Sequence, residues 1–175
     1  MIALGGDVGS SATGLTVLDG RTFLYRISVT PDEVTDALRD ILGRFDVKRV
    51  GIETMSQVFE YGKGAKDPAA RRSIEKHLLA SRDVAGKMRG VVEVLRPGIL
   101  IAGEQAHKIR KAVIGRMPRA PKGVDARTHR DRIVGAFVRR FVLGWPAGKG
   151  DNDHNRDAAV AAVWVQGDAA FARAR

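Results

Sequence analysis

The chain begins with IALGGDVG at residues 2–9, an apolar run that carries a single carboxylate at Asp7. Two further apolar runs follow at Thr13–Leu18 and Thr22–Val29. The pair Asp19-Gly20, which separates them, is favoured in two-residue hairpin turns. This order predicts three antiparallel strands at the start of the chain.

A helix and a fourth strand are predicted next. Thr30-Pro31-Asp32-Glu33 combines a threonine cap, proline at the first helical position and glutamate three residues after the cap. Apolar residues then recur at helical spacing as far as about Gly43. Arg49–Glu53 holds a short apolar run between charged residues, and a helix separates it from the first strand. We therefore expect a buried strand that is parallel to the first one.

A long helical pattern opens at Pro68 and is stopped by Pro97-Gly98. Its small and apolar residues are spaced alternately by four and three positions, as in a seam between packed helices. These residues are Ile74, Leu78, Ser81, Ala85, Met88, Val92 and Leu95. The spacing fits two arrangements equally well: a helix lying on the sheet of its own chain, and a helix packed against a second copy.

The second half of the chain predicts one more strand and three helices. The strand Ile99–Ala102 leads into a basic helix, Gln105–Ile114, and a loop rich in Pro, Gly and Arg precedes a helix at Asp125–Leu143. After a break at Gly144-Trp145-Pro146, a final helix rich in Ala and Val runs from His154 to about Ala170. The order of elements predicts a single mixed α/β domain over residues 1–175.

Composition narrows the class of protein. A chain of 175 residues with 44% hydrophobic residues has room for one buried core. Its longest apolar run, Ala158–Val165, is far shorter than the roughly 20 residues of a membrane-spanning helix. Glycines and Asp7 interrupt the opening run, so we expect no signal peptide. The length of the chain and the lack of a transit-like N-terminus favour the cytoplasm of a prokaryote or a phage-infected cell. The chain has no cysteine, so oxygen or imidazole ligands must hold any metal.

The positive charge is concentrated in one segment. Between Gln105 and Lys149 lie 12 basic residues and only Asp125 and Asp131 on the acidic side, which accounts for the whole net charge of +10. Such a local excess is typical of a protein that neutralises phosphates, although a solvated basic face would also produce it. We expect a nucleic acid as partner.

Three carboxylates and one imidazole are predicted at the ends of elements. Asp7 and Glu53 end the first strand and the strand parallel to it, and His154 and Asp157 share one face at the start of the last helix. If the two strands are neighbours, the four side chains meet at one edge of the sheet. Such ligands would hold one or two Mg²⁺ or Mn²⁺ ions. Each residue taken alone has an ordinary explanation as a helix cap or a solvated strand end.

Nucleophilic serine chemistry is disfavoured by the sequence. Ser10 and Ser11 have no histidine nearby in the chain, and no Gly-x-Ser-x-Gly elbow is present.

Taken together and in this order, the motifs resemble those of the RuvC-type Holliday-junction resolvases, which belong to the RNase H-like nuclease superfamily. The motifs are LGGDVG and TG at residues 4–9 and 13–14, VGIE and QVF at 50–53 and 57–59, IRKAVIG and APK at 109–115 and 120–122, and H-x-x-D-A-x-x-A at 154–161. The resemblance covers nearly the whole chain. It implies an RNase H-like mixed five-stranded sheet with helices on both faces, and a homodimeric endonuclease that cuts symmetric strands of a four-way DNA junction.

The same resemblance implies roles for particular residues. Asp7, Glu53, His154 and Asp157 fall on the catalytic positions, where they would bind two Mg²⁺ ions, with Mn²⁺ as a substitute. The residues that would contact DNA are Arg110, Lys122, Lys108, Lys111, Arg116, Arg119 and Phe59, with Met55 as the alternative to Phe59 for stacking at the junction. Arg110 stands where the family has a lysine, and a guanidinium presents a different donor geometry from an ammonium.

Two other classes of protein share parts of this pattern. A non-catalytic branched-DNA or RNA-binding protein on the same fold would keep the basic segment without needing the carboxylates. A sugar kinase or actin-like ATPase also begins with Asp-x-Gly but requires two duplicated domains. The presence of all four ligand residues favours the nuclease, for which we expect products with 5′-phosphate and 3′-hydroxyl ends.

Overall fold

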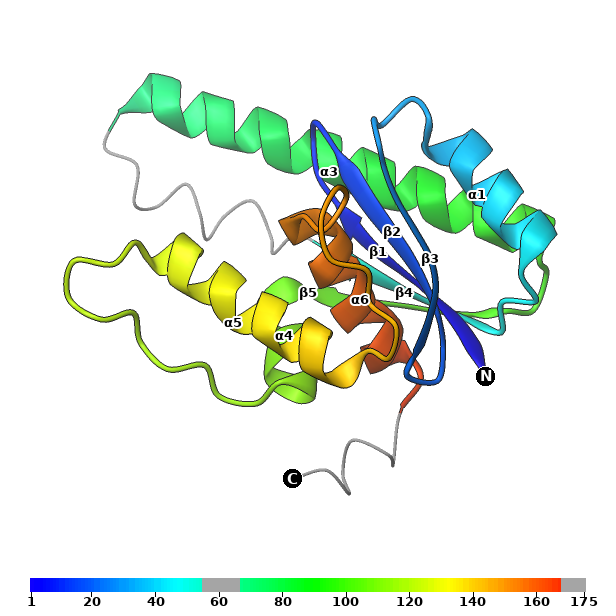
Figure 1. Ribbon diagram of the computed structural model, residues 1–175. Helices are drawn as coiled ribbons and strands as arrows, with labels where there is room; N and C mark the ends of the chain where they lie inside the picture. The colour runs from blue at the N-terminus through cyan, green and yellow to red at the C-terminus, as the bar shows by residue number, and fades with distance from the viewer. Residues whose placement is uncertain (55–66, 168–175) are drawn as a thin grey trace.

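The computed structural model describes residues 1–54 and 67–167, and a five-stranded mixed sheet lies at its centre (Figure 1). The strands are β1 (Ile2–Val8), β2 (Thr13–Asp19), β3 (Thr22–Val29), β4 (Arg49–Thr54) and β5 (Leu100–Gln105). Their order across the sheet is β3-β2-β1-β4-β5. The pairs β1–β2 and β2–β3 are antiparallel, whereas β1–β4 and β4–β5 are parallel. The predicted hairpin that leads into parallel strands is confirmed.

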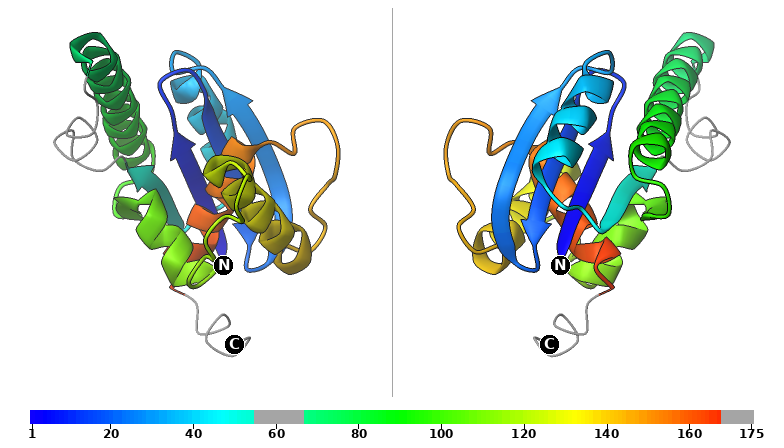
Figure 2. Two further views of the ribbon diagram at one scale, coloured as in Figure 1. Left: turned by 90° about the vertical axis from the view of Figure 1, so that its left-hand side faces the viewer. Right: turned by 90° about the vertical axis from the view of Figure 1, so that its right-hand side faces the viewer.

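Helices cover both faces of this sheet, as predicted (Figure 2). In the described ranges they are α1 (Val34–Arg44), α3 (Pro68–Leu95), α4 (Ala106–Val113), α5 (Ala126–Phe141) and α6 (Asp153–Val165). On one face α1 and α3 pack together over the sheet, while α6 lies on the other face with α4 and α5 beside it.

The two faces have separate hydrophobic cores, because successive strand residues point to opposite sides of a sheet. Val17 belongs to the core under α1 and α3, together with Leu38 and Met88. Its neighbour Leu18 belongs to the core on the other face, together with Val138 of α5. The sheet therefore separates a layer formed by α1 and α3 from a layer that contains α6.

Two helix ends differ from the prediction. The contact between Thr30 and Glu33 forms, since the Glu33 carboxylate accepts hydrogen bonds from the Thr30 amide and hydroxyl, both at 2.8 Å. However, residues 31–33 form a turn, and α1 begins only at Val34. The last helix ends at Val165 rather than near Ala170, because Gly167 adopts a left-handed conformation with φ 63°.

The middle of the α3 seam packs within its own chain, whereas its last residue, Leu95, is exposed. The buried residues of the helix are Leu78, Ser81, Val84, Met88 and Val92. Met88 is fully buried in the core that α1 shares. Of the two arrangements that the spacing allowed, the structure therefore shows the helix lying on its own sheet. Three apolar side chains of α3 are nevertheless exposed: Leu79, Val94 and Leu95.

None of the helices within residues 1–54 and 67–167 is long and apolar enough to cross a membrane.

Candidate active site

The backbone of α6 lies directly against the sheet because glycines face it. A Cβ atom on Gly51 of β4 would lie 2.5 Å from the carbonyl oxygen of Ala161, and one on Gly5 of β1 would overlap the carbonyl oxygen of Ala158. Both alanines are completely buried. This backbone contact fixes the depth of α6 on the sheet, and with it the position of the side chains in its first turn.

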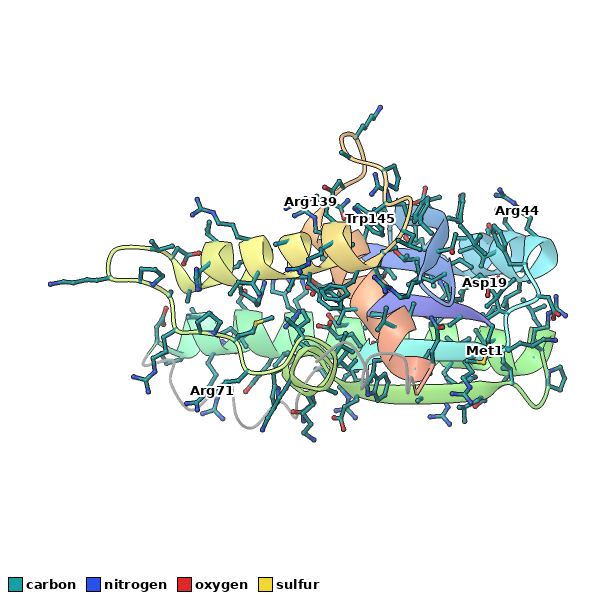
Figure 3. All side chains as sticks on the ribbon, turned by 60° about the horizontal axis from the view of Figure 1, so that its bottom comes forward. Met1, Asp19, Arg44, Arg71, Arg139 and Trp145 are labelled. Carbon is teal, nitrogen blue, oxygen red and sulfur yellow. The ribbon has the colours of Figure 1, made fainter. Side chains whose placement is uncertain are left out.

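The loop that leads into α6 is fixed by Asp151. Its carboxylate accepts hydrogen bonds from Trp145 Nε1 at 3.0 Å and Arg156 Nε at 2.6 Å, and it pairs with Arg139 Nη1 at 3.3 Å. Arg139 and Trp145 lie close to each other in Figure 3. Side chains from α5, from α6 and from the loop itself thus hold the segment immediately before His154.

The four predicted ligand residues meet at one edge of the sheet. Asp7 and Glu53 are direct partners in the parallel register of β1 and β4. His154 and Asp157 reach the same place from the first turns of α6. All four line a pocket of about 290 Å³, together with Val8, Gly9, Leu78, Ala106, Arg110, Arg127, Arg130 and Asp153.

Within this pocket, Asp7 is paired with His154. The His154 Nδ1 atom lies 2.6 Å from Oδ2 of Asp7, and the imidazole is about one-third exposed. The hydrogen bond with Asp7 raises the pKa of His154 against the opposing effect of burial. Because Nδ1 is engaged, Nε2 is the ring nitrogen that is left for a ligand or a proton.

The second pairing involves Arg110, one of the residues expected to contact DNA. The Arg110 side chain is only 10% exposed. Its Nε and Nη2 atoms donate to the two carboxylate oxygens of Asp157, at 2.9 and 2.7 Å. Nη2 also lies 3.5 Å from Oε1 of Glu53. Arg110 is therefore the cation that holds these two acids.

A signal for this burial was present in the sequence and was missed. Ala106, Ile109, Arg110 and Val113 share one face of α4, because they follow the spacing i, i+3, i+4 and i+7. The other three are apolar, so an arginine on that face points inward. Counting charges along the segment does not distinguish Arg110 from the exposed cations around it.

Burial also shifts the pKa values of the carboxyl groups in the pocket. It raises the pKa of Glu53 well above the ordinary range, the nearby Asp7 raises it further, and Arg110 opposes both. Burial likewise raises the pKa of Asp157, against the effect of Arg110. Three acids close together in a poorly solvated pocket favour a bound cation.

The donor types suit a hard divalent metal, since carboxylate oxygens and one imidazole are present. In the structure, however, these side chains are engaged with protein groups and are not arranged around a metal. Among the residues that the structure describes, no three His, Asp or Glu side chains are grouped as ligands of one ion. Both Asp157 oxygens accept from Arg110, and Asp7 is bonded to His154. The chemistry of the set fits the metal, and Arg110 is the cation found there.

Most of the other predicted DNA contacts lie on the surface. Lys108 and Lys111 on α4, and Arg116, Arg119 and Lys122 in the loop after it, are all exposed. Lys108 pairs with Glu104 at 3.2 Å, while the three loop residues form no ion pair within the described ranges. Phe59 and Met55 lie outside the described residues.

Arg127 and Arg130, which the sequence offered only as an alternative place for the DNA contact, line the pocket. Arg127 reaches Asp153 at 3.0 Å, and Arg130 reaches Asp131 at 2.8 Å. Both come from α5, so the basic segment extends to the rim of the acidic pocket.

Ser10 does have a histidine partner in space. Its Oγ lies 2.9 Å from Nδ1 of His77, which is 67 positions away on α3. The pair is exposed, and in the described part of the chain no carboxylate contacts the His77 ring. Without a group to orient the imidazole, the pair lacks the third member of a nucleophilic triad.

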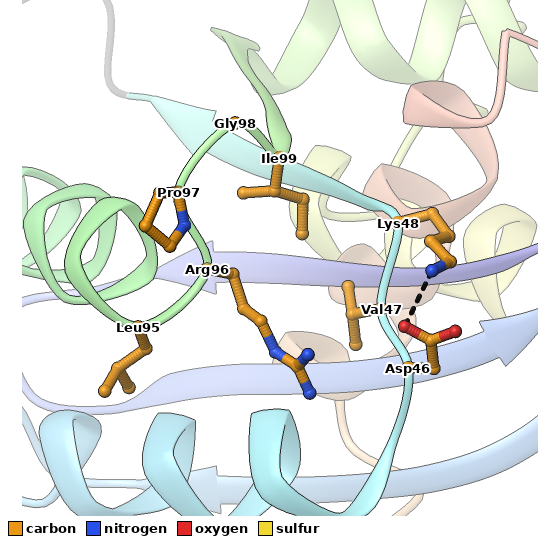
Figure 4. A pocket seen from close by; sticks show the side chains of 8 residues that line it. All are labelled: Asp46, Val47, Lys48, Leu95, Arg96, Pro97, Gly98 and Ile99. Atoms are coloured by element: carbon orange, nitrogen blue, oxygen red, sulfur yellow. Dashed lines mark ion pairs between the residues drawn. The ribbon is translucent and has the colours of Figure 1, made fainter.

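A larger hollow of about 460 Å³ lies at the opposite edge of the sheet, before the starts of β4 and β5 (Figure 4). Its ionisable residues are Asp46, Lys48 and Arg96. Asp46 pairs with Lys48 at 2.8 Å, and Arg96 donates to the carbonyl oxygen of Leu42. With one carboxylate that is already paired, this hollow does not compete with the pocket at Asp7 as a catalytic site.

The contact between Asp7 and His154 gives a testable pH dependence. We expect His154 to titrate above the ordinary value of about 6.5, because the Asp7 carboxylate stabilises the protonated ring. A raised pKa in the folded state contributes stability that is complete below the unfolded value and is lost as pH rises through the folded pKa. NMR titration of the imidazole should show the pKa of His154 falling in Asp7→Asn. An unchanged pKa in that variant would contradict the pairing.

Comparison with known proteins supports the fold. No family model and no curated protein matches this chain. The structure of Thermus thermophilus RuvC is similar with a TM-score of 0.58 at 16% identity, over 99% of this chain and 96% of that one. The structure of T. thermophilus RuvC in complex with a Holliday junction substrate is similar over the same shares, with a TM-score of 0.61 and 16% identity. At this identity the likeness concerns the fold: the chain has an RNase H-like α/β fold, similar to that of RuvC.

Proposed function

We propose that this chain is a metal-dependent endonuclease that resolves four-way DNA junctions by paired phosphodiester hydrolysis. The observation that carries the proposal is the convergence of Asp7, Glu53, His154 and Asp157 in one pocket at the ends of two parallel strands. The junction as substrate is supported by the similar fold of RuvC, which has been solved with a Holliday junction.

The residues of the pocket would have distinct roles in metal binding and proton transfer. Asp7, Glu53 and Asp157 would hold Mg²⁺, or Mn²⁺ in its place, with His154 as a further ligand or as a proton relay. Bound ions of this kind lower the pKa of water and neutralise charge on a phosphodiester. Asp7 orients the imidazole, so that His154 presents Nε2 to the reacting groups.

DNA binding would rest on the exposed cations next to the pocket. Arg116, Arg119 and Lys122 are exposed in the loop between α4 and α5, and within the described ranges no carboxylate neutralises them. Arg127 and Arg130 continue the positive surface to the pocket rim. Contacts of this kind bind phosphates and make affinity strongly dependent on salt.

Paired cutting requires a second active site, so the proposal includes a homodimer. The buried seam of α3 is not available for this contact. Val94 and Leu95 are exposed at 78% and 40% at the C-terminal end of α3, where a second copy would cover them, whereas the exposed Leu79 lies about four helical turns away.

The test of the proposal is incubation with a labelled four-way junction, a matching duplex and a single strand, each with and without Mg²⁺. We expect paired nicks in the junction alone, only with metal, and products that a ligase seals. The pairing of Arg110 with Asp157 favours a second candidate, a non-catalytic protein that binds branched DNA or RNA. That protein would bind the junction and leave it intact at every metal concentration.

Removing charge from the basic loop should change the salt dependence of binding. We expect Arg119→Ala/Lys122→Ala to reduce the log–log slope of affinity against salt by about one for each lost phosphate contact. The matched control is Arg39→Ala/Arg44→Ala on α1, which removes the same charge from the opposite face of the sheet. Equal slopes for the wild type and the loop variant would place the DNA contact elsewhere.

A further inference from the structure

One charged side chain on α4 is built into the pocket, while its neighbours are solvated. Arg110 shares the inward face of α4 with apolar residues and is buried, whereas Lys108 and Lys111 on the same helix are exposed. Packing of the helix therefore determines where the guanidinium lies. Its charge cannot be removed by pH in the working range of a protein.

The guanidinium connects three elements through its hydrogen bonds. It comes from α4, takes both oxygens of Asp157 on α6, and approaches Glu53 on β4. A planar fork matches a carboxylate with two parallel bonds, which a lysine ammonium cannot do. Arg110 thus compensates two of the three acids that the proposed function assigns to the metal.

A divalent ion at these oxygens would lie next to a fixed positive charge in a pocket with little water. The ion would be repelled by the guanidinium, and the two bonds to Asp157 would have to lengthen or break. Binding of the metal is then an exchange of one cation for another.

We propose that Arg110 is an internal cation that competes with the divalent metal for Asp157 and Glu53 and so lowers the metal affinity of the free protein. This inference rests on the proposed function, because it takes these carboxylates as the place where metal binds. It makes Arg110 a positioning residue, which holds the acids together and limits when they accept an ion.

The experiment measures Mn²⁺ binding to the metal-free full-length protein by titration with detection of free Mn²⁺. We expect Arg110→Gln to bind Mn²⁺ at least about tenfold more tightly than the wild type, because the repulsion is removed. Arg110→Lys, which keeps a charge but releases one carboxylate oxygen, should show a smaller gain. The control Arg132→Gln removes the same charge from an exposed position on α5 and should bind like the wild type.

A second measurement, the Tm with and without Mn²⁺, tests whether Arg110→Gln still folds. Without Arg110 two buried acids lose their cation, so the metal-free Tm of Arg110→Gln should fall by about 10 °C. Mn²⁺ should then raise the Tm of Arg110→Gln by more than it raises that of the wild type. If Arg110→Gln does not fold without metal, the comparison of Arg110→Lys with the wild type decides the result.

The outcomes separate this inference from the proposed function. Suppose that the wild type binds Mn²⁺, that Asp7→Asn does not, and that neither Arg110 variant binds Mn²⁺ more tightly than the wild type. The metal site is then supported, and the competition between Arg110 and the metal is refuted. If neither the wild type nor any Arg110 variant binds Mn²⁺, the metal-dependent function fails together with the competition.

Discussion

Replacing Asp7 by asparagine will abolish junction cleavage while junction binding stays intact. The substitution keeps the size of the side chain but removes one of the charges on which a metal in this pocket would depend. We expect the single-turnover rate to fall by at least about 10³-fold, the scale seen when one member of a group acting together is lost. Binding should persist because it rests on phosphate contacts made by the basic segment.

The matched control for this change is Asp46→Asn. Asp46 is an exposed aspartate at the opposite edge of the sheet, where it pairs with Lys48. Cleavage by this variant should equal that of the wild type. Near-normal cleavage by Asp7→Asn would instead remove the assignment of the pocket at β1 and β4 as the metal site.

The strands and their relative directions could be predicted because the signals for them are local. Turn residues such as Asp19-Gly20 bound the apolar runs, and a helix between two buried strands makes those strands parallel. Asp7 and Glu53 were expected to be neighbours on the condition that the two strands lie side by side, and the structure pairs them in register. The place of His154 and Asp157 followed from their helical spacing together with the family resemblance.

Two features of the site were not predicted and become evident from tertiary contacts. The heptad spacing of α3 is the same whether its partner is a sheet or a second helix, and only packing shows that Met88 lies in the core of its own chain. Likewise, Arg110 and Lys111 contribute equally to the net charge of the basic segment, so the charge does not show which of them is buried. Burial distinguishes them, because Arg110 is enclosed with Asp157 and Lys111 is solvated.

The contact between α6 and the sheet was also missed, although the sequence contains both sides of it. Gly5 and Gly51 lie in adjacent strands, and Ala158 and Ala161 share one face of the helix. Small residues on two facing elements allow their backbones to approach closely. This pattern becomes informative only once the two strands are known to be neighbours.

Gly5→Ala should therefore destabilise the protein severely. The added methyl group would overlap the carbonyl oxygen of Ala158 and lie 2.5 Å from the amide nitrogen of Ala162. Both atoms belong to the backbone of α6, so no side chain can rotate away and the helix must move off the sheet. We expect the free energy of unfolding, measured with urea, to fall by more than about 4 kcal/mol, beyond the range of ordinary substitutions.

Two other glycines provide a graded comparison for this prediction. At Gly6 the close contact of the new methyl would be with the flexible end of Met88, at 2.6 Å from its Cε, so Gly6→Ala should cost less than Gly5→Ala. At Gly90 in α3 nothing lies within 4 Å, and Gly90→Ala should stabilise the helix by about 0.5–1 kcal/mol. If Gly5→Ala were as stable as Gly90→Ala, α6 would not rest on the backbone of β1. The positions of His154 and Asp157 relative to Asp7 would then need another explanation.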